Sequence, residues 1–305
     1  MSSEPTAAPA PKQPFLTREA RSPREAILQR LGIGALTFLG NRLAMVGLAI
    51  IVLLVVLAIF APLIATHDPN LQNLRGARLP PSATNFFGTD EYGRDIFSRI
   101  VYGARITLYI VGLVTVTVGP IGLIVGAISG YFGGLVDTIV MRITDLFLAF
   151  PSLILTLAFV AVLGPGLEQA VLAIALTGWP AMARLARAET LTIRSTDYIA
   201  AAKLQGASSW HIIFHSVIPM CLPSVIVRLT LNMAGIILTA AGLGFLGLGA
   251  QPPTPEWGAM TSTGRAYMLD SWWMVTFPGL AIMIVSLAFN LFGDGLRDVL
   301  DPKSN

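Results

Sequence analysis

An all-α integral membrane protein with about six transmembrane helices is the fold class that the sequence predicts, and three observations support it. First, 54% of the 305 residues are hydrophobic and only 12% are charged, whereas soluble domains carry about 25% charged residues. Second, several apolar runs are long enough to cross ~30 Å of hydrocarbon. Third, polar islands separate these runs, as expected for loops that lie in water.

The first 40 residues are predicted to form a basic tail. The segment 1–40 is rich in Ala, Pro and Ser and then in basic residues, which predicts a disordered cytoplasmic tail and a short interfacial helix. Attraction to the lipid surface explains the basic residues, so no nucleic-acid partner is expected. The first long apolar run begins after Arg42 and exceeds the length of a secretory signal core.

The segment 41–100 is predicted to hold the first transmembrane helix and an external loop. The helix, Leu43–Ala65, should run outward, because the positive-inside rule keeps the basic tail in the cytoplasm. The loop, Thr66–Ile100, carries a cluster of turn formers and charges at Gly88–Asp95. An arginine inside that cluster makes it a poor cation site, so a charge-paired turn is the better interpretation. No metal site is predicted.

Two further spans are predicted at Ile106–Gly130 and Thr138–Leu163, and the first carries glycines that permit close helix packing. Three ionisable residues, Asp137, Arg142 and Asp145, lie at the inner end of the second. They fit a charge-paired helix end, which their spacing favours, or a proton relay.

The remaining predicted spans complete the count of about six. Glu168–Ala183 is marginal in length and is followed by arginines that mark its inner end. Ile212–Gly249 is long for one crossing and should bend, and Trp272–Phe292 is the last span. Both termini are therefore expected in the cytoplasm. Arg228 either snorkels to the inner leaflet or contacts an anionic group of a solute.

A moderately polar segment, Thr196–Pro223, separates two strongly apolar regions. Its alanines favour a helix that Gly206 should end, and Ser208 or Ser209 can cap a second helix. Trp210, Ile213, Phe214 and Val217 follow helical spacing and should form one apolar face. Pro219 and Pro223 should then separate this helix from the next span. The segment is therefore predicted to be a helix–turn–helix on the inner membrane face. A surface loop without a partner is the open alternative.

Four motifs resemble one transporter family. Ala201, Ala202, Gly206 and Pro219 match the E-A-A-x3-G-x9-I-x-L-P loop of the inner-membrane permeases of binding-protein-dependent ABC importers, although Ala200, Ser216 and Ile218 depart from it. The runs Gly88–Arg99, Phe245–Gly258 and Phe289–Pro302 resemble the dipeptide/oligopeptide/nickel permeases of that family. The resemblance implies a MetI-like ABC importer permease fold over residues 101–305 and a multi-pass protein of the bacterial cytoplasmic (inner) membrane.

The resemblance also implies partners and site residues. A permease of this family pairs with a homologous second permease as a heterodimer, with two cytoplasmic ABC ATPase subunits and with an extracytoplasmic solute-binding protein. The loop at 190–218 would couple the permease to the ATPases. The coupling residues implied are Asp197, Tyr198, Ala200, Ala201, Ala202, Lys203, Gly206, Ala207, Ser208, Trp210, His211 and Pro219. The external residues implied to dock the binding protein are Asp90, Gly93, Arg94, Asp95, Glu256 and Trp257.

The sequence contains no motif for ATP hydrolysis. None of its three lysines ends a Gly-rich P-loop, and no catalytic motif is present. ATP and Mg²⁺ are therefore expected on the ATPase subunits and no cofactor or catalytic residue on this chain. The predicted function is a non-enzymatic permease that imports di- or oligopeptides by alternating access. Alternatives are an ion-gradient-coupled secondary carrier or a membrane enzyme, and, for the substrate, a nickel chelate, glutathione or an opine.

Overall fold

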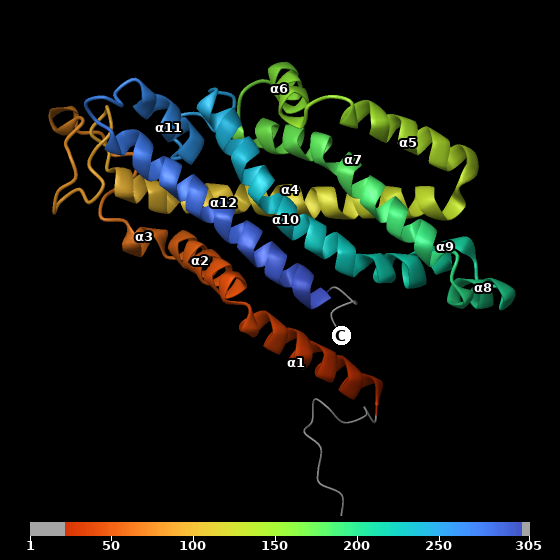
Figure 1. The fold of residues 1–305 in the computed structure, drawn as a ribbon. Helices are drawn as coiled ribbons and strands as arrows, with labels where there is room; N and C mark the ends of the chain where they lie inside the picture. Colours follow the sequence, from red (N-terminus) through yellow and green to blue (C-terminus); the bar gives the residue numbers. More distant parts are fainter. Residues whose placement is uncertain (1–21, 301–305) are drawn as a thin grey trace, which may run out of the picture.

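The computed structural model describes residues 22–300, and within that range the chain is helical with no β-strand beyond a single bridge between Thr89 and Asp95 (Figure 1). A short 3-10 turn, η1 (Leu74–Gly76), lies in the loop before α4, and a π-helical turn, η2 (Ile213–Val217), joins α9 to α10. The helices are α1 (Pro23–Gly40), α2 (Arg42–Ile59), α3 (Ala61–Ile64), α4 (Ile96–Phe132), α5 (Gly134–Leu148), α6 (Ser152–Leu163), α7 (Leu167–Ile193), α8 (Asp197–Leu204), α9 (Ser209–Ile212), α10 (Ile218–Phe245), α11 (Trp257–Arg265) and α12 (Trp273–Leu300).

Four helical segments of the described range are long and apolar enough to cross a membrane: α2, α4, the continuous α9–α10 segment, and α12. The pair α5 and α6 bends by 90° and adds a fifth crossing if it counts as one span. The predicted span Thr138–Leu163 is therefore interrupted by a sharp bend. Pro151 lies at the bend, where the residue before a proline leaves the helical region of backbone space. α7 is long enough for a sixth crossing but carries charges near its end, so it does not meet the apolarity criterion.

The second half of the predicted tail is a helix. Ser22 begins α1, because its Oγ accepts a hydrogen bond from the backbone N–H of Glu25 at 3.2 Å, and Pro23 occupies the first turn. α1 also packs against α12, with Phe38 edge-on to Phe292 at 5.6 Å between ring centroids. The predicted short helix is therefore present as α1, and it extends over residues 23–40, so the disordered tail that was predicted up to residue 40 is shorter than expected. Residues 1–21 lie outside the described range.

Helices α4 and α7 form the most extensive helix pair of the fold. Gly122, Gly126 and Gly130 of α4 face α7, and a Cβ added at Gly126 would lie 2.3 Å from the carbonyl oxygen of Ala183. The absence of a side chain at these positions lets the two backbones approach, as the sequence predicted. Gly112, on the same helix, has no atom within 4 Å of an added Cβ and takes no part in this contact.

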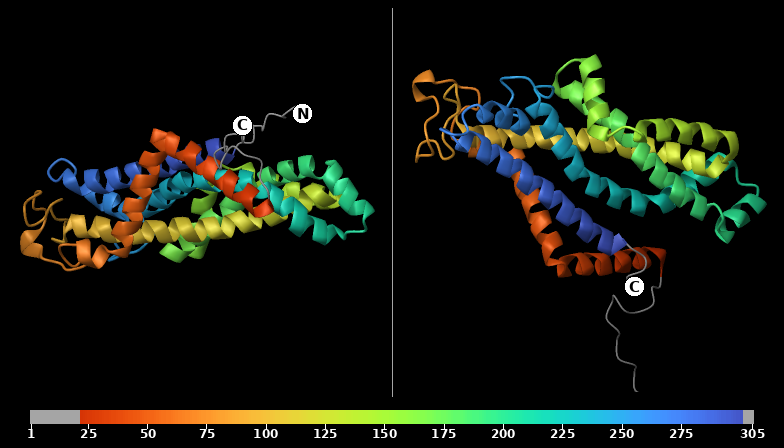
Figure 2. Two further views of the ribbon diagram at one scale, coloured as in Figure 1. Left: turned by 90° about the horizontal axis from the view of Figure 1, so that it is seen from below. Right: turned by 45° about the horizontal axis from the view of Figure 1, so that its top comes forward.

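The molecule is elongated, and its two ends differ. In both views of Figure 2 the loops before α4 lie at one end, and α8 and α9 lie at the other. We refer to the first end as the loop lobe (residues 65–95 and 246–272). The long helices connect the loop lobe to α8 and α9, so the two ends are joined by continuous rigid elements.

Candidate functional site

The turn between α8 and α9 has the predicted helix–turn–helix form. Gly206 has φ +82°, a conformation that costs an L-residue energy but not glycine. Its N–H donates to the carbonyl of Lys203 at 3.0 Å, and the N–H of Ala207 donates to the carbonyl of Ala202 at 3.1 Å. Ser208 then caps α9, because its Oγ accepts from the N–H of His211 at 3.3 Å. The local fold of the segment therefore follows from glycine and serine at these positions.

The second helix does not end at Pro219 and Pro223, as the sequence predicted. α9 runs through η2 into α10 without a break, and the N–H of Ile218 donates to the carbonyl of Ile213, five residues back. Pro219 occupies the first turn of α10, and Pro223 lies within it. Proline has no N–H and crowds the carbonyl four residues before it, and a wide π turn next to a proline relieves both problems. The predicted boundary is therefore corrected to one rod, Ser209–Phe245.

The predicted apolar face of the second helix is divided between the core and the surface. Ile213 and Val217 are fully buried, whereas Trp210 is 54% exposed and Phe214 is 47% exposed. The π turn inserts a residue into the helical register, so the four positions do not share one face. The aromatic side chains lie instead in a surface row in which Phe132 contacts Trp210 at 5.6 Å and Trp210 contacts Phe214 at 6.2 Å between centroids.

A large apolar surface is left open at this end of the molecule. Tyr198 is 61% exposed and Leu204 is 89% exposed; with Trp210 and Phe214 they form what we call the α8–α9 tip. The other predicted coupling residues that are exposed are Asp197, Ala200, Ala201, Lys203, Gly206, Ser208, His211 and Pro219, while Ala202 and Ala207 are half-buried. Ile199 is fully buried and anchors α8.

The tip is tied to the long helices. Arg194, at the end of α7, donates from Nη1 to the carbonyl of Gly130 at 2.7 Å and to that of Tyr131 at 3.3 Å. The ammonium of Lys203 lies 5.3 Å from the centre of the Tyr131 ring. A displacement of the tip would therefore be transmitted to α4 and α7 as well as to α10.

The charges at the inner end of the third predicted span are paired with a neighbouring helix. Arg187 of α7 donates to both oxygens of Asp137 at 2.5 Å, and Ser129 donates to the same carboxylate at 2.6 Å. Arg184 contacts Asp145 at 2.5 Å. Arg142 is exposed and, within residues 22–300, has no hydrogen bond or ion pair. The favoured interpretation, charge pairing, is supported, but the pairs join α5 to α7 rather than residues of one helix end.

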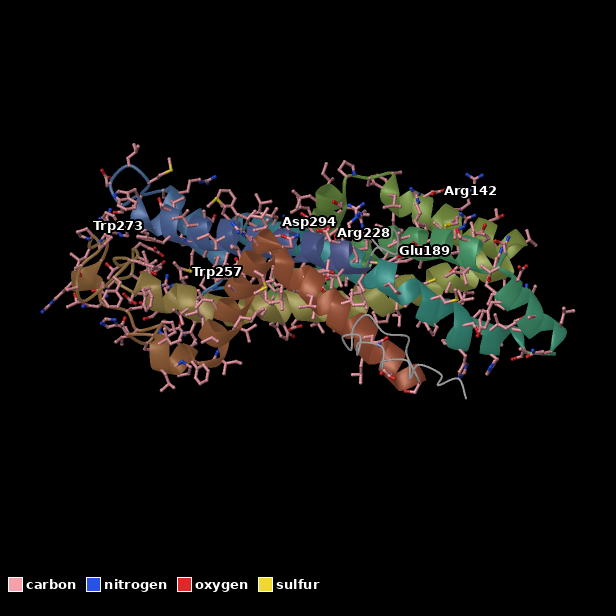
Figure 3. The ribbon with its side chains drawn as sticks, turned by 60° about the horizontal axis from the view of Figure 1, so that its bottom comes forward. Arg142, Glu189, Arg228, Trp257, Trp273 and Asp294 are labelled. Atoms are coloured by element: carbon pink, nitrogen blue, oxygen red, sulfur yellow. The ribbon has the colours of Figure 1, made fainter. Side chains whose placement is uncertain are left out.

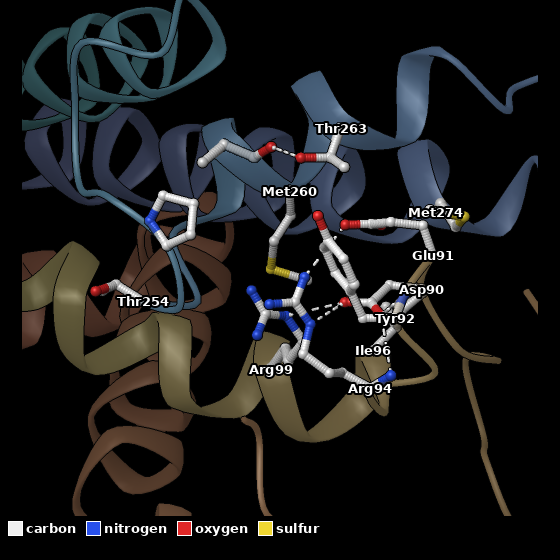
Figure 4. Close-up of a pocket in the computed structure, with 12 residues that line it drawn as sticks. Asp90, Glu91, Tyr92, Arg94, Ile96, Arg99, Thr254, Met260, Thr263 and Met274 are labelled. Carbon is white, nitrogen blue, oxygen red and sulfur yellow. Dashed lines mark hydrogen bonds and ion pairs between the residues drawn. The ribbon is translucent and has the colours of Figure 1, made fainter. Parts of the chain in front are cut away.

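The charged cluster in the loop lobe is a closed network (Figure 4). Asp90 accepts from the N–H groups of Tyr92 and Arg94 at 2.9 Å and from Arg94 Nε at 2.5 Å. Asp95 caps α4 by accepting from the N–H of Ser98 at 2.8 Å. The prediction of a charge-paired turn is confirmed. Within residues 22–300 no group of three or more His, Cys, Asp or Glu side chains could hold a metal ion.

Most predicted docking residues of the loop lobe are buried. Five of them are at most 6% exposed: Asp90, Arg94, Asp95, Glu256 and Trp257. Gly93 is not free either, since an added Cβ would overlap the backbone of Asn73. These residues build the lobe rather than present a surface. Several apolar residues of the lobe are exposed instead, among them Leu74, Phe86, Leu269 and Trp272.

Glu256 and Trp257 fix helix α11 to the rest of the lobe. The carboxylate of Glu256 accepts from the N–H groups of Gly258 at 2.8 Å and Ala259 at 2.7 Å, and burial raises its pKa to about 7. The indole N–H of Trp257 donates to the carbonyl of Ile100 at 3.1 Å.

Arg99 also holds the lobe together, and the sequence analysis gave it no role. It is 4% exposed and donates from Nη1 to the carbonyls of Pro69 at 2.9 Å and Pro253 at 3.3 Å. It lines a cavity of about 130 Å³ with Asp90, Glu91 and Arg94, where burial raises the pKa of Glu91. In the sequence, the signal for this role was the position of Arg99 in the Ser98-Arg99 pair that ends the loop motif Gly88–Arg99.

Comparison with known proteins agrees with this architecture. Residues 122–305 match the family described as binding-protein-dependent transport system inner membrane component, and residues 35–81 match the N-terminal TM domain of oligopeptide transport permease C. The chain is 50% identical over 266 residues to the probable D,D-dipeptide transport system permease protein DdpC of Escherichia coli, covering 87% of this chain and 89% of the relative. It is 49% identical over 264 residues to the dipeptide transport system permease protein DppC of Alkalihalophilus pseudofirmus, covering 86% of each. The chain therefore belongs to the inner-membrane permease family of binding-protein-dependent transport systems.

Proposed function

We propose that this chain is the permease subunit of an ATP-driven importer that moves di- or oligopeptides into the cell by alternating access. The family match supports a membrane permease that works with a binding protein, and the relatives named above are dipeptide systems. We do not propose an ion-coupled carrier. Asp137 and Asp145 each form an ion pair with an arginine near the surface and do not form a proton relay. The chain itself acts as a non-enzymatic transport subunit.

The observation that carries the proposal is the α8–α9 tip. Four large side chains lie exposed at one end of the molecule, on a turn that is tied to three long helices. An exposed apolar surface of this kind marks an interaction site. We assign it to the cytoplasmic ATPase subunits, and we accordingly propose that both termini lie in the cytoplasm and that the loop lobe lies outside.

The geometry provides a route for coupling. The rod Ser209–Phe245 has 37 residues and spans about 55 Å at ~1.5 Å per residue. It begins at the tip and ends next to the loop lobe, in which the carbonyl of Leu248 accepts a hydrogen bond from the N–H of Gly166 at 3.3 Å. Closure of the ATPases on ATP would move the tip, and the rod would carry that movement to the outer surface.

The loop lobe is assigned to the solute-binding protein. The buried residues Asp90, Arg94 and Asp95 position the exposed ones, of which Leu269 is 94% exposed and Trp272 is 51% exposed. A second, homologous permease would complete the pathway as a heterodimer. The open apolar side chains of α5, such as Leu135 at 80% exposure, are available for that contact or for lipid.

Purification from the native membrane in mild detergent, followed by mass spectrometry, tests the proposal. We expect a second permease and one or two P-loop ATPases with the wild-type chain. Trp210→Glu should lose the ATPases, whereas the matched control Trp272→Glu, at the opposite end and equally exposed, should keep them. Recovery of the chain alone, or equal ATPase recovery with both variants, would refute the proposal.

A further inference from the structure

A groove of about 480 Å³ lies where α7, α10 and α12 meet, toward the end of the molecule that carries the tip. This volume is within the range of small-molecule sites, about 300–1,000 Å³. Its lining includes Glu189 from α7, Arg228 from α10 and Arg297 from α12, with Ser224 and Leu231 between them. Figure 3 shows Glu189 and Arg228 between the two ends of the molecule.

Within residues 22–300 the charges of this groove have no ion-pair partners, in contrast to two arginines of α7. Within residues 22–300, none of Glu189, Arg228 and Arg297 forms an ion pair, whereas Arg184 and Arg187, on the same helix as Glu189, are paired with α5. Arg228 also lies inside a helix that qualifies as a membrane span, and Arg297 lies in the last turn of another. An ionisable residue in a span is costly, and it is commonly retained because it serves a solute pathway.

The pattern of charges defines the class of ligand. Two guanidinium groups and one carboxylate leave one net positive charge in the lining. Guanidinium binds carboxylate with geometric preference, and a carboxylate binds an ammonium group. A peptide with free ends carries both groups. Asp294, the acid one turn before Arg297 on α12, does not line the groove.

We propose that this groove binds the free ends of the transported peptide, with Arg228 and Arg297 on its carboxylate and Glu189 on its ammonium group. The inference rests on the proposed function, because it assigns a substrate contact to a peptide permease. It accounts for charges that the fold leaves unpaired, and it places the contact at the inner side, where an imported peptide is released.

Binding to the whole transporter complex, in phosphatidylcholine nanodiscs and without the solute-binding protein, tests this site. The probes are alanyl-alanine, its C-terminal amide and its N-acetyl derivative. The wild type should bind the free dipeptide about tenfold more tightly than the amide, the effect of losing one charge-assisted contact. Arg228→Gln and Arg297→Gln should reduce that ratio to about one. Glu189→Gln should abolish the preference for the free amine over the acetylated form.

Matched controls separate a binding role from a structural one. Arg142→Gln removes an exposed arginine of α5 that also has no ion pair among the residues the structure describes, and it should keep the full preference for the free carboxylate. Arg228→Lys retains the charge and should keep part of it. All variants should elute as the intact complex in size-exclusion chromatography, because the altered side chains line an open groove.

Three results would overturn the inference. The ratio of the affinity for the free dipeptide to that for its amide could stay unchanged in Arg228→Gln and Arg297→Gln, or it could fall equally in Arg142→Gln. The wild type could also lose dipeptide binding in phosphatidylglycerol nanodiscs, which would assign the groove to a lipid phosphate. If the ATPases still copurify in any of these cases, the proposed function stands and only the groove assignment fails.

Discussion

Gly206 offers the most direct test of the coupling assignment. Its φ of +82° sets the angle between α8 and α9, and no atom lies within 4 Å of an added Cβ. A substitution there changes the backbone preference without creating a clash. Gly206→Val should therefore disturb the turn and leave the packing of the spans intact.

The size of the effect follows from the backbone. A left-handed conformation costs an L-residue roughly 1–2 kcal/mol, with a β-branched residue near the upper limit. The turn is held by two backbone hydrogen bonds and the Ser208 cap, and such a cap contributes about 1 kcal/mol. The cost is thus a large part of the local stability, so the equilibrium shifts away from the competent turn. Asparagine tolerates this conformation, so Gly206→Asn should keep most of the function.

Peptide uptake in cells and ATPase recovery in the detergent pull-down measure the effect. Gly206→Val should reduce both, by at most about 5–30-fold, the change in the equilibrium constant that corresponds to 1–2 kcal/mol. Gly164→Val is the matched control, because Gly164 also has positive φ (+91°) and open space at its Cβ but lies in the turn between α6 and α7. Normal uptake with Gly206→Val, or equal loss with Gly164→Val, would refute the coupling assignment.

Three further predictions test the supports of the site. Gly126→Val should lower the thermal midpoint strongly, because its side chain would overlap α7, whereas Gly112→Val, with no neighbour within 4 Å, should not; a thermal-shift assay compares the two. Burial raises the pKa of Glu256 from 4.5 to about 7. Between these two pH values the folded state keeps a proton that the unfolded state releases. The free energy of unfolding should therefore fall by up to about 3 kcal/mol as the pH rises from 4.5 to 7. Glu256→Gln should flatten this slope in melting curves recorded between pH 4 and 8. Asp137→Asn should destabilise the α5–α7 contact by about 1.5–3 kcal/mol, measured by denaturation. The double variant Asp137→Arg with Arg187→Asp exchanges the two charges and should recover part of this loss.

Local chemistry made some of the site predictable. Glycine and serine specify the turn at Gly206 and the cap at Ser208 regardless of what surrounds them, so the predicted helix–turn–helix matches the structure. The small residues of α4 likewise predicted its close contact with α7. Each of these features depends on the backbone of a few consecutive residues or on one helical face.

Other features depend on contacts that no local pattern contains. The partners of Asp137 and Asp145 are on α7, far along the chain, and the spacing on one helix could show only that they needed partners. Asp95 looked like a surface charge in a polar loop, but its burial results from the packing of the loop onto α4. A polar segment can supply its own internal network, so polarity alone did not reveal exposure.

The two charged regions of the molecule point to different roles. In the loop lobe, Asp90 and Arg94 satisfy each other in a buried network, and a closed network of this kind adds rigidity rather than a binding site. Toward the α8–α9 tip, Arg228 and Arg297 have no ion-pair partner within residues 22–300. The loop lobe is rigid, the α8–α9 tip is exposed, and the rod Ser209–Phe245 joins them, so we expect movement of the tip to change the groove beside the rod. The groove is therefore the part of the chain where the driving motion and the solute would meet.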